Sequence, residues 1–123
     1  MKHVLLIFLG GGVGSVLRYL ISSYFNSSET HLYLGTFLVN IIGCLILGII
    51  LGLSLKYNWM STETTLLLGV GFCGGFTTFS SFGFEMYTLL KGNHFGMFFL
   101  YSGASLVVGF TCVVLGLWLS RAW

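Results

Sequence analysis

The sequence contains no proline and no aspartate, and only 7% of its 123 residues are charged. Because soluble domains carry roughly 25% charged residues, this composition excludes an ordinary soluble fold. The few basic residues are spread along the chain and form no patch that could bind nucleic acid. With 56% hydrophobic residues and a mean hydropathy of +0.98, the chain is predicted to be an all-α membrane protein.

Residues that could carry catalysis are also scarce. The three carboxylates are too widely separated to form an acid and base pair, at Glu29, Glu63 and Glu85. The histidines have no metal-ligand spacing. The cysteines are odd in number and lack a CxxC motif, so we interpret them as small buried hydrophobes, at Cys44, Cys73 and Cys112. The sequence therefore predicts that the protein is not an enzyme.

Four apolar stretches are long enough to span a bilayer, which takes about 20 helical residues. Helices are predicted over about residues 4–25, 34–55, 64–90 and 95–119, which form one transmembrane domain covering residues 1–123. The loops between them are short and polar. The first stretch follows Lys2 as in a signal peptide, but it lacks an Ala-x-Ala site and continues into a full span. It is interpreted as the first helix.

The basic residues are nearly balanced across the predicted membrane. Lys2, Lys56 and Arg121 lie on one side, whereas Lys91 and Arg18 lie on the other. So weak a bias is compatible with insertion in both orientations, and four helices alone cannot readily enclose a polar path. The sequence therefore favours an antiparallel homodimer. Glycine pairs with small-xxx-small spacing indicate close helix packing, at Gly10 and Gly14, Gly48 and Gly52, and Gly71 and Gly75.

The third segment is the least regular of the four. Glycines between Gly69 and Gly75 each disfavour helix by about 1 kcal/mol relative to alanine, and hydroxyl residues interleaved with phenylalanines follow from Thr77 to Phe82. The midpoint of the span falls at Thr77. The sequence predicts a helix broken near mid-membrane, where freed carbonyls require protein or a water-filled cavity. The run Gly69 to Gly74 also fits GxGxxG, but it lacks the strand context of a dinucleotide site.

Two polar side chains lie inside predicted spans. Asn40 stands among aliphatic residues of the second span, and we favour a functional role over a simple contact between helices. Arg18 would be costly at a helix centre and less so near an end. Two roles stay open for Arg18: an interface anchor, or a positive charge that attracts anions to an entrance.

The phenylalanines of the third segment form a column, because Phe79 and Phe82 share a helix face. One interpretation is a packed aromatic core. The other is an anion path, since the positive edge of an aromatic ring stabilises a small anion. Ser80, Ser81 and Asn40 would then donate the hydrogen bonds that replace lost hydration.

Together these residues resemble the CrcB/Fluc family of microbial fluoride channels. The similarity is carried by the runs Gly74–Phe82, Gly11–Arg18 and Gly35–Gly43, in the family's order and spacing, and it covers essentially the whole chain. The resemblance implies four-helix subunits with a broken third helix, assembled as a dual-topology antiparallel homodimer. It also implies two fluoride pores and a structural sodium ion at the dimer interface.

The resemblance assigns roles to individual residues. Pore-lining positions are expected at Phe79, Phe82, Asn40, Ser80, Ser81, Tyr101 and Ser105, with Arg18 near the vestibule and Glu85 as the acid that follows the aromatic pair. Backbone carbonyls of Gly74 and Thr77 are expected to bind sodium. The sequence departs from the family pattern at Ser81, where threonine is common, and at Gly109, where a second serine can occur.

The implied function is passive export of fluoride across the cytoplasmic membrane. The alternative is a small multidrug antiporter, which is also a four-helix dual-topology dimer but needs a membrane-embedded carboxylate, and the first helix has none. A structural subunit without transport would leave Asn40 and the predicted break unexplained. The expected partners are fluoride, a second copy of the chain and membrane lipid.

Overall fold

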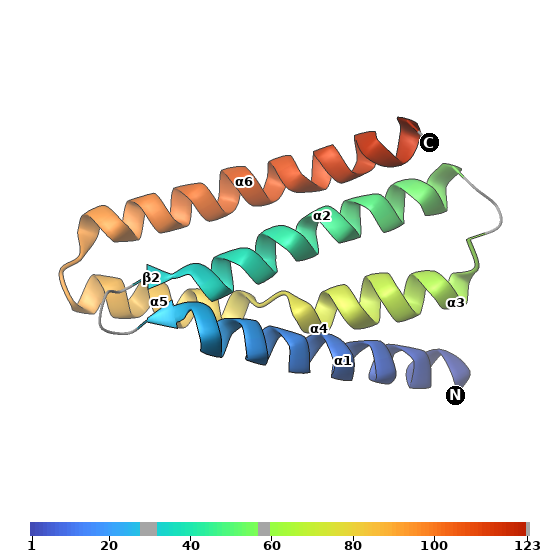
Figure 1. The fold of residues 1–123 in the computed structure, drawn as a ribbon, viewed down its shortest axis with the longest axis horizontal. Coiled ribbons are helices and arrows are strands. Elements are labelled where there is room, and N and C mark those ends of the chain that lie inside the picture. Colours follow the sequence, from blue (N-terminus) through green and yellow to red (C-terminus); the bar gives the residue numbers. More distant parts are fainter. Residues whose placement is uncertain (28–31, 57–59, 123) are drawn as a thin grey trace.

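The computed structural model is a bundle of four long segments that lie side by side (Figure 1). Its described residues are 1–27, 32–56 and 60–122. Glu29, one of the three carboxylates, and His31, one of the three histidines, lie outside them. Within the described residues four helical segments are long and apolar enough to cross a membrane, which confirms the predicted number of spans. The chain is therefore a multi-pass membrane protein.

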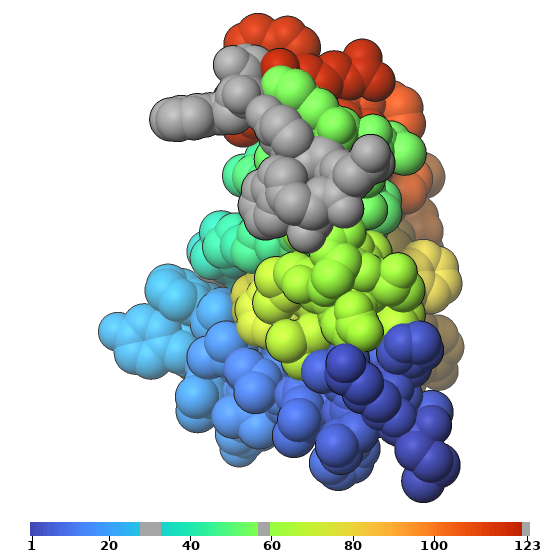
Figure 2. Space-filling view, turned by 90° about the vertical axis from the view of Figure 1, so that its right-hand side faces the viewer, coloured from blue at the N-terminus to red at the C-terminus, as the bar shows by residue number. Residues whose placement is uncertain are grey.

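The first, second and fourth spans are single helices, namely α1 (Lys2–Phe25), α2 (Leu34–Lys56) and α6 (Phe95–Ala122). The third span contains α3 (Thr62–Thr64), the π-helix η1 (Thr65–Cys73), α4 (Gly74–Phe76) and α5 (Phe79–Lys91). In Figure 1 the segments follow the order α6, α2, third span and α1, and Figure 2 shows the same order from the end where the N-terminus lies. The third span thus lies between α1 and α2.

Short connections join the helices. Strands β1 (Asn26–Ser27) and β2 (Leu32–Tyr33) pair antiparallel between α1 and α2, with Asn26 opposite Tyr33. Between α5 and α6 the chain turns at Asn93, whose φ of 57° is left-handed. Asparagine tolerates this conformation better than most residues, and the His94 N–H donates to the Leu89 carbonyl to close the turn.

The helical backbone of the third span is interrupted between α4 and α5. Thr77 has φ −80° and ψ 157°, and Thr78 has φ −149° and ψ 116°, so both are extended. Upstream of this point the chain forms the π-helix η1 where an ordinary helix was expected. A π-helix closes hydrogen bonds over one more residue than an α-helix and is frequent at functional sites.

Glycines bring α1 and the third span into backbone contact. A Cβ atom added at Gly10 would meet the carbonyl of Leu67, and one added at Gly14 would meet the carbonyl of Phe72. On the facing side, Gly71 and Gly75 approach the backbone of α1 equally closely. The close packing predicted from these two pairs is confirmed.

Helices α2 and α6 are also brought into backbone contact by glycines. Gly48 of α2 faces the Val113 carbonyl, and Gly116 of α6 faces the Leu45 carbonyl. Gly52 instead leaves space for the side chain of Ser120. Backbone contact of this kind provides the van der Waals packing that associates helices in lipid.

Candidate functional site

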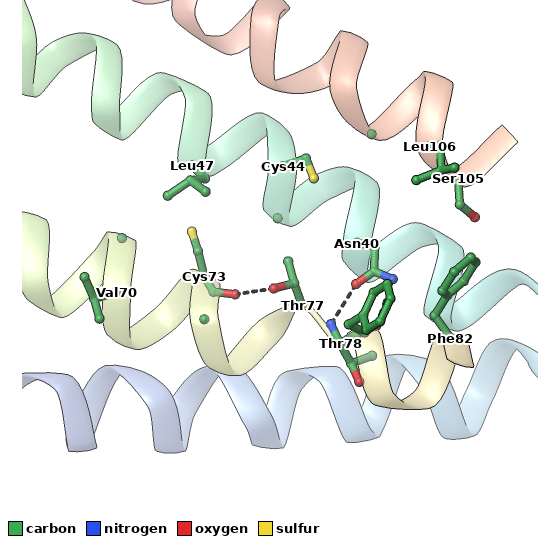
Figure 3. Close-up of a pocket in the computed structure, with 15 residues that line it drawn as sticks. Asn40, Cys44, Leu47, Val70, Cys73, Thr77, Thr78, Phe82, Ser105 and Leu106 are labelled. Carbon is green, nitrogen blue, oxygen red and sulfur yellow. Dashed lines mark hydrogen bonds between the residues drawn. The ribbon is translucent and has the colours of Figure 1, made fainter. Parts of the chain in front are cut away.

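A cavity of about 370 Å³ lies beside the interruption, between α2, the third span and α6 (Figure 3). Its wall includes several of the predicted site residues, namely Asn40, Gly74, Thr77, Phe79, Phe82 and Ser105. These come from three different spans, so the fold brings together residues that are far apart in the sequence. Ser80, Ser81, Tyr101 and Arg18 are not part of this wall.

Asn40 contacts the interruption directly. Its Oδ1 accepts a hydrogen bond from the Thr78 N–H at 2.7 Å, and its Nδ2 donates to the Thr78 carbonyl at 3.2 Å (Figure 3). One amide side chain therefore satisfies both backbone polar groups of an extended residue. Inside a membrane such groups need a protein partner, so Asn40 stabilises the interruption.

Thr78 begins α5 as its N-cap. Its Oγ1 accepts from the Ser81 N–H at 3.2 Å, which satisfies one of the free donors of the first helical turn. The same hydroxyl donates to the Ser81 Oγ at 3.0 Å and lies 3.3 Å from the Ser80 Oγ. The three hydroxyls thus form one cluster at the start of α5. The sequence analysis noted Thr78 as polar but assigned it no role.

The aromatic pair of α5 differs in exposure along its length. The side chain of Phe79 is 82% exposed, whereas Phe82 is partly covered. Their ring centroids are 5.9 Å apart, and Phe82 also packs against Tyr101 of α6 at 5.2 Å. Both distances lie in the range of favourable aromatic contacts. The ring of Phe79 is therefore accessible on the cavity wall.

Two residues, Gly74 and Thr77, are predicted to bind sodium. Gly74 is the first residue of α4, and Thr77 follows its last residue. Because the Thr78 N–H donates to Asn40, it does not close a helical turn onto the Gly74 carbonyl. Gly74 is exposed, and no atom lies within 4 Å of a Cβ built on it. Thr77 uses its N–H and its Oγ1 to donate to the Cys73 carbonyl, at 3.0 and 2.9 Å.

Comparison with known proteins places the chain among relatives of similar length. The family model described as "CrcB-like protein, Camphor Resistance (CrcB)" matches residues 5–117. The chain belongs to the CrcB family. It is 46% identical over 122 residues to a protein of Phocaeicola vulgatus, covering 98% of this chain and 100% of the relative. It is 47% identical over 122 residues to a protein of Gloeothece citriformis, covering 98% of each. Both relatives are named fluoride-specific ion channel FluC.

Arg18, which was expected near the vestibule, lies away from the cavity. Arg18 is half-buried, and its Nε donates to the Gly75 carbonyl at 3.0 Å, beside Ser15, whose Oγ donates to the same oxygen at 3.4 Å. The sequence left two roles open for Arg18, an interface anchor and a charge that attracts anions. Neither role predicts this hydrogen bond to Gly75. Arg18 satisfies a carbonyl at the end of α4.

Glu85, the acid that follows the aromatic pair, lies in a polar cluster that the sequence did not predict. Glu85 is only 6% exposed, and Oε1 accepts from the Thr36 hydroxyl at 2.5 Å and from Asn26 Nδ2 at 3.3 Å. Its Oε2 accepts from the Tyr101 hydroxyl at 2.8 Å. Thr36 stands four residues before Asn40 on the same helix face, and this spacing was a usable signal.

Two further positions named in the sequence analysis, Ser105 and Gly109, lie on the cavity wall. Ser105 Oγ is buried and has no hydrogen-bond partner among the described residues, and it lies on the cavity wall. Gly109 is buried, and a Cβ added there would lie 3.7 Å from the Cys44 sulfur. In the part of the chain that the structure describes, no group of three or more His, Cys, Asp or Glu side chains could bind a metal.

Proposed function

We propose that the chain is a fluoride-selective ion channel that exports fluoride passively. The observation that carries this proposal is the position of Phe79 and Phe82, tilted rings 5.9 Å apart on the wall of a largely apolar cavity that Asn40, Thr77, Thr78 and Ser105 also line. The relatives named as fluoride channels match this chain over nearly its full length, and the antiporter alternative has no such support. Conduction requires a path and needs no catalytic group.

The cavity wall combines two features that a fluoride path requires. Ring edges of Phe79 and Phe82 carry partial positive charge and stabilise an anion without binding it permanently. The Ser105 hydroxyl lies on the wall, has no competing partner among the described residues and can replace hydration. Ser80 and Ser81 lie outside the wall, in the first turn of α5, and would donate to fluoride next to it. Asn40 contributes by fixing Thr78, since both ends of its amide are bonded there.

The active form is an antiparallel, dual-topology homodimer. A single subunit leaves Phe79 82% exposed beside Asn40 and Ser105. Polar side chains within spans face protein or water rather than lipid tails, so a second copy covering the cavity is favoured. The near balance of basic residues across the membrane supports insertion in both orientations. In this assembly the extended pair Thr77 and Thr78 is the mid-membrane break of the third helix.

A structural sodium ion lies between the two copies. The Gly74 carbonyl has lost its helical donor to Asn40, and Thr77 is extended. Carbonyls from two opposed copies would supply the hard oxygen ligands that a small hard cation prefers. Binding by backbone atoms is consistent with the absence of a metal-binding side-chain cluster among the described residues.

The protein operates in the cytoplasmic membrane. Hydrogen fluoride enters a cell, dissociates at the higher internal pH and leaves fluoride behind, so a passive path out relieves its toxicity. Efflux from fluoride-loaded liposomes, read with a fluoride electrode, tests the proposal, with chloride-loaded liposomes as the control. Fluoride efflux without chloride efflux is expected. Protein-containing liposomes that release no more fluoride than empty ones would refute it.

A further inference from the structure

Asn26 is the most fully hydrogen-bonded side chain outside the cavity, and neither the motifs nor the proposed function uses it. It follows the last residue of α1 as its C-cap, where its own N–H donates to the Ser22 carbonyl. Its Oδ1 accepts from the N–H groups of Gly35 and Thr36, at 2.8 and 3.2 Å. These donors belong to the first turn of α2, which has no helical partners for them.

The other half of the amide reaches the buried acid. Asn26 Nδ2 donates to Thr36 Oγ1 at 3.0 Å and to Glu85 Oε1 at 3.3 Å. An asparagine side chain offers two donors and one oxygen with two acceptor sites, and here all four are used. Asn26 is therefore bonded to α2 and to α5 at the same time.

Glu85 also accepts a hydrogen bond from Tyr101 of α6, so it links Asn26 to that helix. Its carboxylate accepts from Asn26, Thr36 and Tyr101, so each of the four spans or its adjoining residue contributes one member. A buried carboxylate is costly unless it is fully hydrogen-bonded. The position of each member thus depends on the others.

Tyr101 connects the cluster to the cavity wall. Its hydroxyl is bonded to Glu85, and its ring packs against Phe82 with a centroid distance of 5.2 Å. On its other side Tyr33 lies 6.0 Å away, between centroids. Burial raises the pKa of the Tyr33 phenol, and the nearby charge of Glu85 raises it further. The Tyr101 ring is therefore fixed by the acid at one end and borders the aromatic pair at the other.

We propose that Asn26 is a positioning residue for ion passage. It acts through Glu85 and Tyr101 to fix the ring of Phe82, although it does not itself line the cavity. This inference rests on the proposed function, because the effect on conduction requires a conducting channel. The effect on Phe82 is structural and can be measured without any ion flux.

The geometry predicts a specific pair of substitutions. In Asn26→Asp the carboxylate still accepts from the Gly35 and Thr36 N–H groups, so the start of α2 keeps its cap. It can no longer donate to Glu85 or to the Thr36 hydroxyl, and two carboxylates then face each other. Adding Glu85→Gln to this variant again gives one amide and one carboxylate, with their positions exchanged. The amide at position 85 then donates to the carboxylate at position 26.

The first measurement is fluoride efflux from liposomes. Loss of the two hydrogen bonds that Nδ2 donates, with repulsion from Glu85 in place of the charge-assisted one, should slow efflux of Asn26→Asp by about tenfold or more. The combined variant should recover most of that loss. Asn93→Asp makes the same chemical change at an exposed turn and serves as the matched control, with efflux like wild type.

The second measurement separates positioning from folding. 4-Fluorophenylalanine at position 82 gives a ¹⁹F resonance of the purified protein in micelles. The resonance should shift or broaden in Asn26→Asp, return in the combined variant and stay unchanged in Asn93→Asp. If Asn26→Asp leaves both efflux and the resonance as in wild type, or if the combined variant does not recover, the inference is overturned. Wild-type liposomes without efflux would instead refute the proposed function, while the resonance would still test the positioning role.

Discussion

The guanidinium of Arg18 donates from Nε to the carbonyl oxygen of Gly75, 3.0 Å away. Gly75 lies in α4, immediately before the chain becomes extended at Thr77. Carbonyls at the end of a helix carry partial negative charge and lack helical donors. A hydrogen bond from a charged donor is roughly twice as strong as a neutral one. Arg18 therefore acts as a side-chain cap for the first half of the third span.

Replacing Arg18 by methionine should lower stability. The Gly75 carbonyl would lose its charged donor and keep only the longer hydrogen bond from Ser15, and a hydrogen bond to a charged group contributes about 1.5 to 3 kcal/mol. Thermal unfolding of the purified protein in detergent would measure the loss, with the exposed Arg121→Met as the control. If Arg18→Met unfolds like wild type while its fluoride efflux falls, Arg18 serves ion entry instead of the cap.

Replacing Phe79 or Phe82 by isoleucine separates an aromatic ion path from a packed core. The swap keeps much of the apolar volume, so stability should fall by less than about 1.5 kcal/mol. Loss of the ring edge should slow efflux by about a hundredfold, which corresponds to about 2.8 kcal/mol in the barrier. Phe8→Ile, on an exposed part of α1, is the control. Efflux near wild type from both variants would return the pair to core packing.

The proposed dual topology predicts that one site is accessible from both sides of the membrane. Asn93 would be a poor site for a cysteine because its backbone is left-handed, with φ 57°. Gly96 is exposed, and no atom lies within 4 Å of a Cβ built there. In a background with the three native cysteines replaced, Gly96→Cys should react with a membrane-impermeant maleimide from either side. Labelling from one side alone would exclude dual topology.

Removing sodium should reduce fluoride efflux. If carbonyls of Gly74 and Thr77 bind the ion between two copies, its absence leaves partial negative charges facing one another at the interface. Efflux would be compared in sodium-containing and rigorously sodium-free buffers, with N-methyl-D-glucamine as the replacement cation. The bound ion cannot be tested well by substitution, because its ligands are backbone atoms. Equal efflux in both buffers argues against the site.

The four spans could be predicted because membrane helices are long and apolar, so hydropathy alone locates them. The tight glycine contacts could also be predicted, because the small-xxx-small spacing is visible along a single helix. The partners of Asn40 and Glu85 could not. The Thr78 backbone lies 38 residues from Asn40, and Thr36 lies 49 residues from Glu85. Such hydrogen bonds depend on how separate spans pack, which local patterns do not encode.

The π-helix η1 also had no signal in the sequence. Its residues, Thr65–Cys73, belong to the predicted third helix, and their two glycines indicate only a weaker helix, because neither glycines nor apolar residues distinguish a π-helix from an α-helix. One additional residue in each hydrogen-bonded ring changes the direction in which the following side chains point. The orientation of Gly74 and Thr77 toward the cavity is therefore a property of the fold, although their identity as candidate residues came from the sequence.

The backbone contact of α1 with the third span has a consequence for motion. At Gly10 and Gly14 no side chain separates the two backbones, so there is no rotamer whose change could let them slide. We therefore expect these two segments to move as one unit. On the opposite side of the span, α5 contacts α6 through the rings of Phe82 and Tyr101 and the Glu85 hydrogen bond. We therefore expect side-chain rearrangements that open or narrow the path to occur on the α5–α6 side rather than at α1.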